Sequence, residues 1–252
     1  MSRRIRPLVH RLLEPACVAL CLLLGPAPRA SAAGELHTFE LRDGGRLEYA
    51  ELLPPVYRRE TRYPLLLALP PGSQTRSMVE RALGLYWSKV AAHGWIVVSP
   101  AAPGGRLFFR GSERTIPELL DHLARTHALE GDRVYLAGVS NGGRSAFRIA
   151  TLYPERFAAL VALPGFPPEA GDFARLERIR ALPIALFGDS LDRRWVEQME
   201  RTRDRLRELG GRVTLTVYPG EGHVPASLSG GEVLLRTLES QRLERRNRGH
   251  RE

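Results

Sequence analysis

The chain has 252 residues, enough for one domain of ordinary size, and its 43% hydrophobic fraction is sufficient for a buried core. Its formal net charge is +9, from 37 basic and 28 acidic residues. Lys89 is the only lysine and the excess charge lies near the two ends, so this composition does not indicate a nucleic-acid-binding patch.

The first 32 residues have the pattern of a secretory signal peptide. Arg3, Arg4 and Arg6 form a basic start, residues 16–24 are a short apolar run, and Ala30-Ser31-Ala32 is a cleavage site. The apolar run is too short for a stable membrane span, although an uncleaved N-terminal anchor is the alternative. Cleavage after Ala32 removes both cysteines and leaves 32 basic and 27 acidic residues, a net charge of +5. These features predict an exported protein, periplasmic or extracellular.

Residues 33–241 are expected to form one α/β domain. Residues 36–41 and 46–52 alternate around Asp43-Gly44-Gly45, which predicts an antiparallel hairpin at the leading edge of a sheet. Apolar runs then alternate with segments of helical periodicity, a pattern typical of a mostly parallel sheet with helices on both faces. Strands are predicted at 64–69, 95–99, 134–137, 157–163, 183–187 and 212–218, and helices at 79–90, 117–128, 144–152, 173–179, 194–209 and 231–243.

Three further features concern the surroundings of this sheet. Thr115 and Glu118 have the spacing of a capping box, which predicts side-chain hydrogen bonds at the start of the helix 117–128. No long insertion follows residue 163, where a lid would lie, so an open site is expected. Residues 242–252 contain five arginines and two glutamates, and they are predicted to be a basic, solvated C-terminal tail.

A serine lies between the predicted strand 134–137 and the predicted helix 144–152. It is the centre of Gly138-Val139-Ser140-Asn141-Gly142, and a Gly-x-Ser-x-Gly sequence between a strand and a helix is typical of a nucleophile elbow. The glycines give the neighbouring backbone room to pass close to a strained serine. Ser140 is therefore the predicted nucleophile, and a surface serine in an ordinary turn is the alternative.

A histidine and two aspartates follow Ser140 in the chain order that such an elbow requires. His223, after the last predicted strand, is the expected general base, with a solvated loop histidine as the alternative. Asp189 and Asp192 both follow the strand 183–187. Asp192 is the preferred acid, because Asp189 directly follows Gly188 and its side chain is expected to serve the turn. The alternative for Asp192 is a helix N-cap.

Two backbone N–H groups are expected to form an oxyanion hole. One belongs to Asn141, directly after the nucleophile. The other is expected after the strand 64–69, where two prolines carry no N–H and Gly72, Ser73 or Gln74 remains. Ser73 is the preferred donor, and a Pro-Gly turn without function is the alternative. No cofactor and no metal ligand set is predicted.

Several of these segments resemble a known family. Four segments are similar to segments of secreted α/β-hydrolases of the esterase group. They are Leu69-Pro70-Pro71-Gly72, Gly138 to Gly143, Phe187-Gly188 with its aspartates, and Pro219 to His223. That group includes polyhydroxyalkanoate depolymerases, feruloyl and acetyl esterases and dienelactone-hydrolase-like proteins. The resemblance implies the α/β-hydrolase fold and an ester hydrolase that works through an acyl-enzyme. It also favours Asp192, because the family's acid usually follows the glycine by a few residues. Pro-Gly stands where the family has His-Gly.

The resemblance does not specify the substrate. An open site with aromatic side chains nearby predicts short-acyl or aromatic esters, either small molecules or esters on a polymer. A secreted serine peptidase of the same fold and a catalytically silent α/β-hydrolase that binds a ligand or partner are the alternatives, and the oligomeric state is left open. The aromatic residues expected to be available are Tyr86, Trp87, Phe108, Phe109, Phe166 and Trp195.

Overall fold

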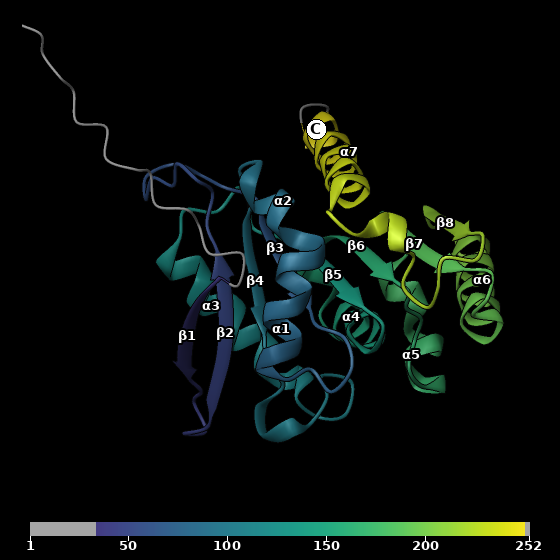
Figure 1. Ribbon diagram of the computed structural model, residues 1–252, viewed down its shortest axis with the longest axis horizontal. Helices are drawn as coiled ribbons and strands as arrows, with labels where there is room; N and C mark the ends of the chain where they lie inside the picture. Colours follow the sequence, from purple (N-terminus) through teal and green to yellow (C-terminus); the bar gives the residue numbers. More distant parts are fainter. Residues whose placement is uncertain (1–33, 250–252) are drawn as a thin grey trace, which may run out of the picture.

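A computed structural model describes residues 34–249, so the predicted signal peptide lies outside the described residues. The described part forms one eight-stranded sheet in the order β1-β2-β4-β3-β5-β6-β7-β8 (Figure 1). Its strands are β1 (Glu35–Glu40), β2 (Arg46–Leu52), β3 (Leu65–Leu69), β4 (Ile96–Pro100), β5 (Val134–Val139), β6 (Phe157–Leu163), β7 (Ile184–Asp189) and β8 (Val213–Tyr218).

The predicted mixture of strand directions is confirmed. β1 pairs with β2 and β2 pairs with β4 in antiparallel fashion, whereas all pairs from β4 to β8 are parallel. The central strands are apolar throughout because both faces of the sheet are covered. β5 lies between β3 and β6, so the residue that follows β5 lies at the middle of the sheet's carboxyl edge.

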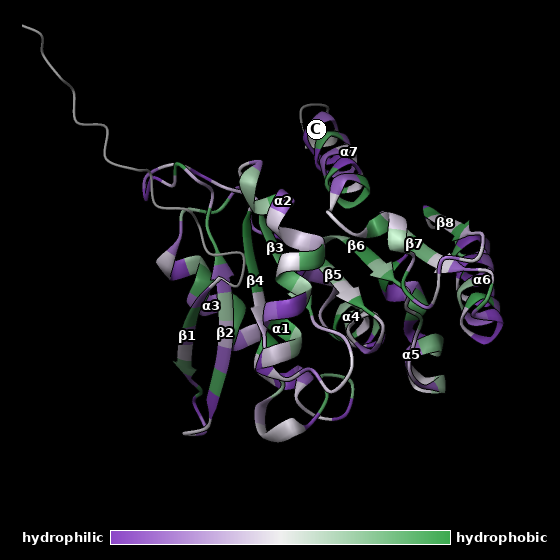
Figure 2. Cartoon of the chain, in the orientation of Figure 1, coloured by the Kyte–Doolittle hydropathy of each residue, from purple (hydrophilic) through white to green (hydrophobic). Residues whose placement is uncertain are grey.

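Two groups of helices cover the two faces of the sheet. One face carries α1 (Arg76–Ala82), a π-helical turn (Leu83–Trp87), α2 (Ser88–Ala92) and α7 (Glu232–Gly249). The other carries α3 (Ile116–Thr126), α4 (Asn141–Leu152) and α6 (Arg193–Glu208), with the short α5 (Ala170–Ala174) nearby. Successive β3 residues alternate between the two apolar layers, with Leu67 in one and Leu66 in the other. Figure 2 shows hydrophobic residues concentrated in the central strands, whereas the helices and the leading hairpin carry both hydrophobic and hydrophilic residues.

The capping box predicted at the start of α3 is wrong. The Thr115 hydroxyl donates to the Ser112 carbonyl at 2.8 Å, and the Glu118 carboxylate accepts the backbone N–H of Arg42 at 2.9 Å. A 3₁₀ turn, Glu113–Thr115, runs directly into α3, so Thr115 has helical φ and ψ angles of −79° and −18°. A capping side chain needs a non-helical backbone at this position, which the preceding turn excludes.

The C-terminal helix α7 continues beyond residue 242, where the sequence predicts a tail. Trp95 donates its indole N–H to Glu239 at 2.6 Å, Arg242 pairs with Glu130 at 2.5 Å, and Arg245 pairs with Asp132 at 2.8 Å. The Arg242 guanidinium holds the pKa of the Glu130 carboxyl below its usual value. Residues 242–249 are therefore helical, and ion pairs attach their first turn to the loop before β5.

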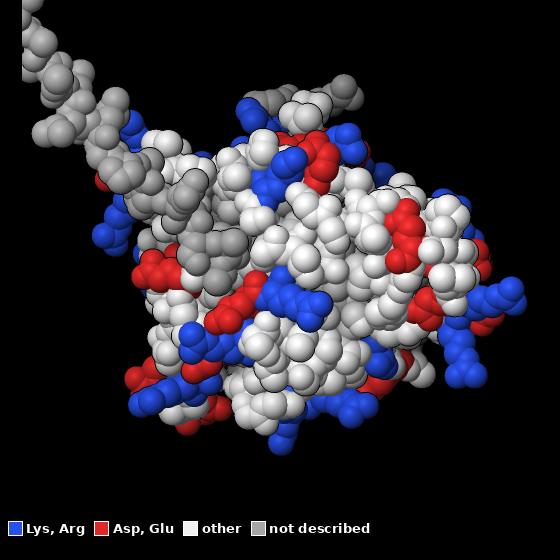
Figure 3. Space-filling model, in the orientation of Figure 1, with Lys and Arg blue, Asp and Glu red and all other residues white. Residues whose placement is uncertain are grey.

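None of the described helices is both long and apolar enough to cross a membrane. In the face shown in Figure 3, basic and acidic side chains are interspersed, and a basic and an acidic side chain lie next to each other near its centre.

We expect Arg242→Ala to lower the free energy of unfolding by about 1 kcal/mol at neutral pH, since it removes an ion pair and packing against Trp95. The difference from wild type should shrink as the pH falls below 4.5, the unfolded pKa of Glu130, because the folded carboxyl has the lower pKa. Urea unfolding at several pH values measures both effects. Arg246→Ala, at an exposed position four residues further along the helix, is the control. An equal decrease in the free energy of unfolding for both variants would contradict a stabilising role of the Arg242–Glu130 ion pair.

Candidate active site

Ser140 lies between the end of β5 and the start of α4 in a strained backbone conformation. Its φ is 55° and its ψ is −115°, a combination that residues other than glycine rarely adopt. Strand and helix are joined through this single residue, so the chain must reverse its direction there. Such a turn presents the serine side chain at the carboxyl edge of the sheet.

Three glycines around this serine are required by close backbone contacts. A Cβ atom on Gly138 would overlap the Gly142 carbonyl, and one on Gly142 would overlap the Leu69 carbonyl at the end of β3. A Cβ atom on Gly143 would overlap the Pro164 carbonyl after β6. The first turn of α4 therefore lies directly against the ends of both strands that flank β5.

Ser140, His223 and Asp192 form one hydrogen-bonded chain. The Ser140 Oγ lies 2.8 Å from His223 Nε2, and His223 Nδ1 lies 2.5 Å from an Asp192 carboxylate oxygen. When Nδ1 carries the imidazole proton and donates a hydrogen bond to the carboxylate, Nε2 is unprotonated and can accept the hydroxyl proton. The three side chains follow β5, β8 and β7 respectively, so the parallel sheet brings them together at one edge.

Asp189 lies three residues before Asp192, but its carboxylate has hydrogen-bond partners outside the Ser140–His223–Asp192 triad. Its side chain is 1% exposed and accepts the backbone N–H groups of Leu191 at 2.9 Å and Glu221 at 2.6 Å. Burial raises the pKa of the Asp189 carboxyl, but N–H donors from Leu191, Glu221 and Gly222 outweigh burial and hold that pKa below its usual value. Asp189 thus joins the loop after β7 to the loop that carries His223.

The loop after β3 lies against the elbow. The Asn141 side chain donates to the Gly72 carbonyl at 2.9 Å. The backbone N–H of Gln74 donates to the Pro71 carbonyl at 3.0 Å, so it is not available to an oxyanion. The N–H groups of Gly72, Ser73 and Asn141 donate to no described residue. The N–H groups expected to form the oxyanion hole therefore have no hydrogen-bond acceptor among the described residues, and they line one cavity. Either Gly72 or Ser73 can supply the second N–H beside that of Asn141.

Gln74, expected from the sequence only as an N–H donor, holds three segments together. It is fully buried with a φ of 57°, and its amide donates to the Ser145 hydroxyl of α4 at 2.9 Å. Its side-chain oxygen accepts the backbone N–H of Phe108, in the loop after β4, at 2.8 Å. The sequence offers no signal that this polar side chain points into the core.

The six aromatic residues expected near the site have different positions. The prediction is wrong for Trp87 and Phe108, which are fully buried in the core, and Phe109 is only 3% exposed. The ring of Trp195, in the first turn of α6, lies 4.7 Å from the His223 imidazole, and the Phe166 ring lies 4.9 Å from Trp195. Tyr86 packs against Trp87 beside α1, with no described contact to the triad.

The triad is open to solvent. His223 is 43% exposed at its side chain and Asp192 is 24% exposed. Between β6 and β7 the chain contains only α5 and a 3₁₀ turn, Arg175–Ile179, as expected for a fold without a large lid. A cavity of about 390 Å³ lies beside the elbow and is lined by Gly72, Ser73 and Asn141 among others.

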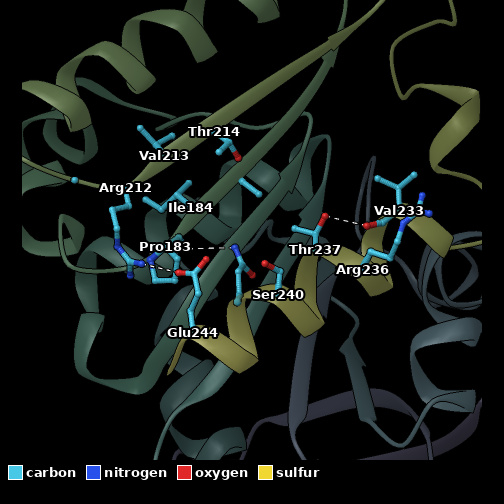
Figure 4. A pocket seen from close by; sticks show the side chains of 13 residues that line it. Pro183, Ile184, Arg212, Val213, Thr214, Val233, Arg236, Thr237, Ser240 and Glu244 are labelled. Carbon is cyan, nitrogen blue, oxygen red and sulfur yellow. Dashed lines mark hydrogen bonds and ion pairs between the residues drawn. The ribbon is translucent and has the colours of Figure 1, made fainter. Parts of the chain in front are cut away.

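A larger cavity, of about 640 Å³, lies elsewhere, where β7 and β8 meet α7 (Figure 4). It is lined by apolar and polar side chains, including Ile184, Val213 and Thr237, and by none of the triad residues. The hydrogen-bonded triad, rather than cavity size, therefore identifies the candidate active site.

No family model matches the chain. It is 27% identical to dipeptidyl-peptidase 5 of Porphyromonas gingivalis over 147 residues, and this matched region covers 53% of this chain and 21% of that protein. Among solved structures, a thermostable esterase superposes with a TM-score of 0.67 at 21% identity, covering 84% of this chain and 62% of its own. Est1E from Butyrivibrio proteoclasticus gives a TM-score of 0.63 at 14% identity, covering 82% and 98%. The AtxE2 isopeptidase gives 0.59 at 19% identity, covering 77% and 37%.

These likenesses and the strand order show that the chain has the α/β-hydrolase fold. The chain spans about a fifth of the length of the curated relative that it matches. Both esterases and peptidases share this fold.

We expect Gly142→Ala to lower the free energy of unfolding by about 2 kcal/mol or more, because the added Cβ overlaps the backbone of β3. Gly171→Ala, where the added Cβ meets only the end of the Arg175 side chain at 3.4 Å, is the matched control. Thermal or urea unfolding compares the two. Equal stability of both variants would show that the elbow is not packed as described.

We expect Asp192→Asn to slow the labelling of the nucleophile by a fluorophosphonate by about 10³-fold or more, because the amide no longer holds the required histidine tautomer. Asp189→Asn should have a smaller effect, through the His223 loop. Labelling rates need no knowledge of the natural substrate. A larger loss in Asp189→Asn than in Asp192→Asn would reverse the assignment of the acid.

Proposed function

We propose that this protein is a serine hydrolase that cleaves carboxylic esters through an acyl-enzyme. The observation that carries this proposal is the hydrogen-bonded chain from Ser140 through His223 to Asp192 at a strained strand-to-helix turn. The α/β-hydrolase fold and its esterase and peptidase neighbours support a hydrolase.

In the first half of the reaction, Ser140 attacks the ester carbonyl carbon while its proton passes to His223 Nε2. Asp192 orients the imidazole and stabilises the imidazolium. The N–H groups of Asn141 and Ser73 bind the negative charge that develops on the carbonyl oxygen. His223 then gives the proton to the departing alcohol oxygen, the carbon–oxygen bond breaks, and the acyl group stays on the serine.

In the second half, water takes the place of the alcohol. His223 accepts a proton from the water as its oxygen attacks the acyl carbon, and then returns the proton to the serine oxygen as the acid leaves.

A serine peptidase is the second candidate, since the same triad can cleave amides. The neighbours of this fold include esterases and peptidases alike, and the comparison of aryl esters with peptide anilides described below decides between the two reactions. A protein that only binds a partner has no need of the three-residue hydrogen-bonded chain.

For the substrate we propose short-acyl or aromatic esters, free or on a polymer, because the triad is exposed, Trp195 lies beside His223 and Phe166 packs against Trp195. Export to the periplasm or the exterior is proposed from the pattern of residues 1–32.

The test is a fluorophosphonate probe followed by peptide mapping, together with a panel of aryl esters of rising acyl length and matched peptide anilides. We expect the label on Ser140 and a loss of about 10³-fold or more in kcat/KM for Ser140→Ala. Ser77→Ala, at an exposed position on α1, is the control. Activity on anilides alone would favour the peptidase, and an active Ser140→Ala variant would defeat the proposal.

A further inference from the structure

Three arginines beside the nucleophile have no carboxylate partner among the described residues. Arg106 and Arg110 line the cavity that also contains Ser73 and Asn141. Arg144 lies one turn into α4, where its backbone N–H donates to the Ser140 carbonyl at 3.1 Å.

Two carboxylates of the same region have other partners. Glu113 accepts the backbone N–H of Gly111, and Glu169 pairs with Arg148 at 2.6 Å. Neither forms an ion pair with the three arginines, although the charge of Glu169 acts on Arg144 and partly offsets the burial and the Arg110 charge that lower its pKa.

The Arg144 guanidinium is held between two aromatic rings. Its Cζ lies 4.5 Å from the centre of the Phe109 ring and 5.6 Å from that of Phe166. One Nη donates to the Pro168 carbonyl at 3.2 Å, whereas the buried Nε has no acceptor among the described residues. Burial, and then the positive charge of Arg110, lower the pKa of Arg144. These contacts fix the position of the guanidinium, while its positive charge has no carboxylate partner and some of its N–H groups have no acceptor among the described residues.

This guanidinium is connected to His223 of the triad through two aromatic rings. A row of ring contacts leads from His223 to Trp195, then to Phe166, and from there to Arg144. Because helical side chains lean toward the amino end of their helix, Arg144 is directed back toward the elbow. In the space-filling view, basic side chains lie at the lower margin, where the loops after β3 and β4 emerge in Figure 1 (Figure 3).

A second guanidinium, that of Arg110, also contacts the Phe109 ring. The Cζ of Arg110 is 5.6 Å from the centre of the Phe109 ring. Two such cations repel each other, and an anion between them removes that repulsion. A carboxylate has the chemistry to bind such guanidinium groups, since its two oxygens match the planar fork of N–H donors on each of them.

We propose that the ester substrate carries a carboxylate near its scissile bond and that Arg110 and Arg144 bind this group, with Arg106 beside Arg110 in the lining of the cavity at the elbow. This inference rests on the proposed serine hydrolase function and specifies its substrate class. The carboxylate belongs to either the acyl part or the alcohol part of the ester, and the test contains one arm for each.

The test compares anionic esters with neutral esters of matched size. For the acyl part, aryl monoesters of succinate and glutarate are paired with aryl butyrate and valerate. For the alcohol part, 4-acetoxybenzoate is paired with 4-acetoxybenzamide. We expect the anionic ester to have at least about a tenfold higher kcat/KM in one arm, and this preference to weaken as salt is added.

The arginine variants assign the preference to the site. Arg144→Gln and Arg110→Gln should each lower the ratio of anionic to neutral kcat/KM by about tenfold, and Arg144→Lys should retain part of it. Arg201→Gln serves as the control, because it removes an arginine of α6 that lies over the ring of Phe173 in α5.

Two kinds of failure can be told apart. Equal kcat/KM values for anionic and neutral esters, or Arg144→Gln losing both activities in the same proportion, would overturn the inference while leaving the hydrolase proposal intact. No hydrolysis of any ester by the wild type, or full activity of Ser140→Ala, would overturn the proposed function and the inference with it.

Discussion

The close packing of the first turn of α4 against the ends of β3 and β6 is the constraint on which the rest of the site depends. Gly142 touches the Leu69 carbonyl and Gly143 touches the Pro164 carbonyl, so there is no space for a side chain at either position. The helix must therefore start directly at the sheet edge, and the residue before it takes the strained conformation seen at Ser140. The surrounding packing holds the serine in a geometry that it would not adopt alone.

Buried polar groups hold the loops around this turn. Gln74 connects the loop after β3 to α4 and to the loop after β4, and Asp189 connects the loops after β7 and β8. Neither side chain is proposed to touch the substrate. Each fixes backbone that carries a proposed catalytic group, so Ser73 and His223 depend on them for position.

Much of the fold could be predicted from the sequence because its signals are local: turn residues between alternating strands, apolar runs and helical periodicity. The chain order of Ser140, Asp192 and His223 likewise follows from the elbow and from later strand ends. Features that depend on tertiary contacts could not be predicted. The burial of Trp87 and Phe108, the use of Gln74 as a connector and the enclosure of Arg144 between two rings all arise from segments distant in the chain. The capping box does not form, although its sequence pattern is local, because the preceding turn holds the backbone of Thr115 in a helical conformation.

The central claim is that an acyl group is transferred to Ser140. Acid quenching during turnover of an activated aryl ester, followed by intact-mass measurement and peptide mapping, tests it directly. If Ser140 is the nucleophile, we expect one acyl group per chain, located on the peptide that contains Ser140, and a burst of released alcohol of the same stoichiometry. An acyl group on another residue, or hydrolysis that proceeds without a burst and without any adduct for every activated ester tried, would contradict acyl transfer to Ser140.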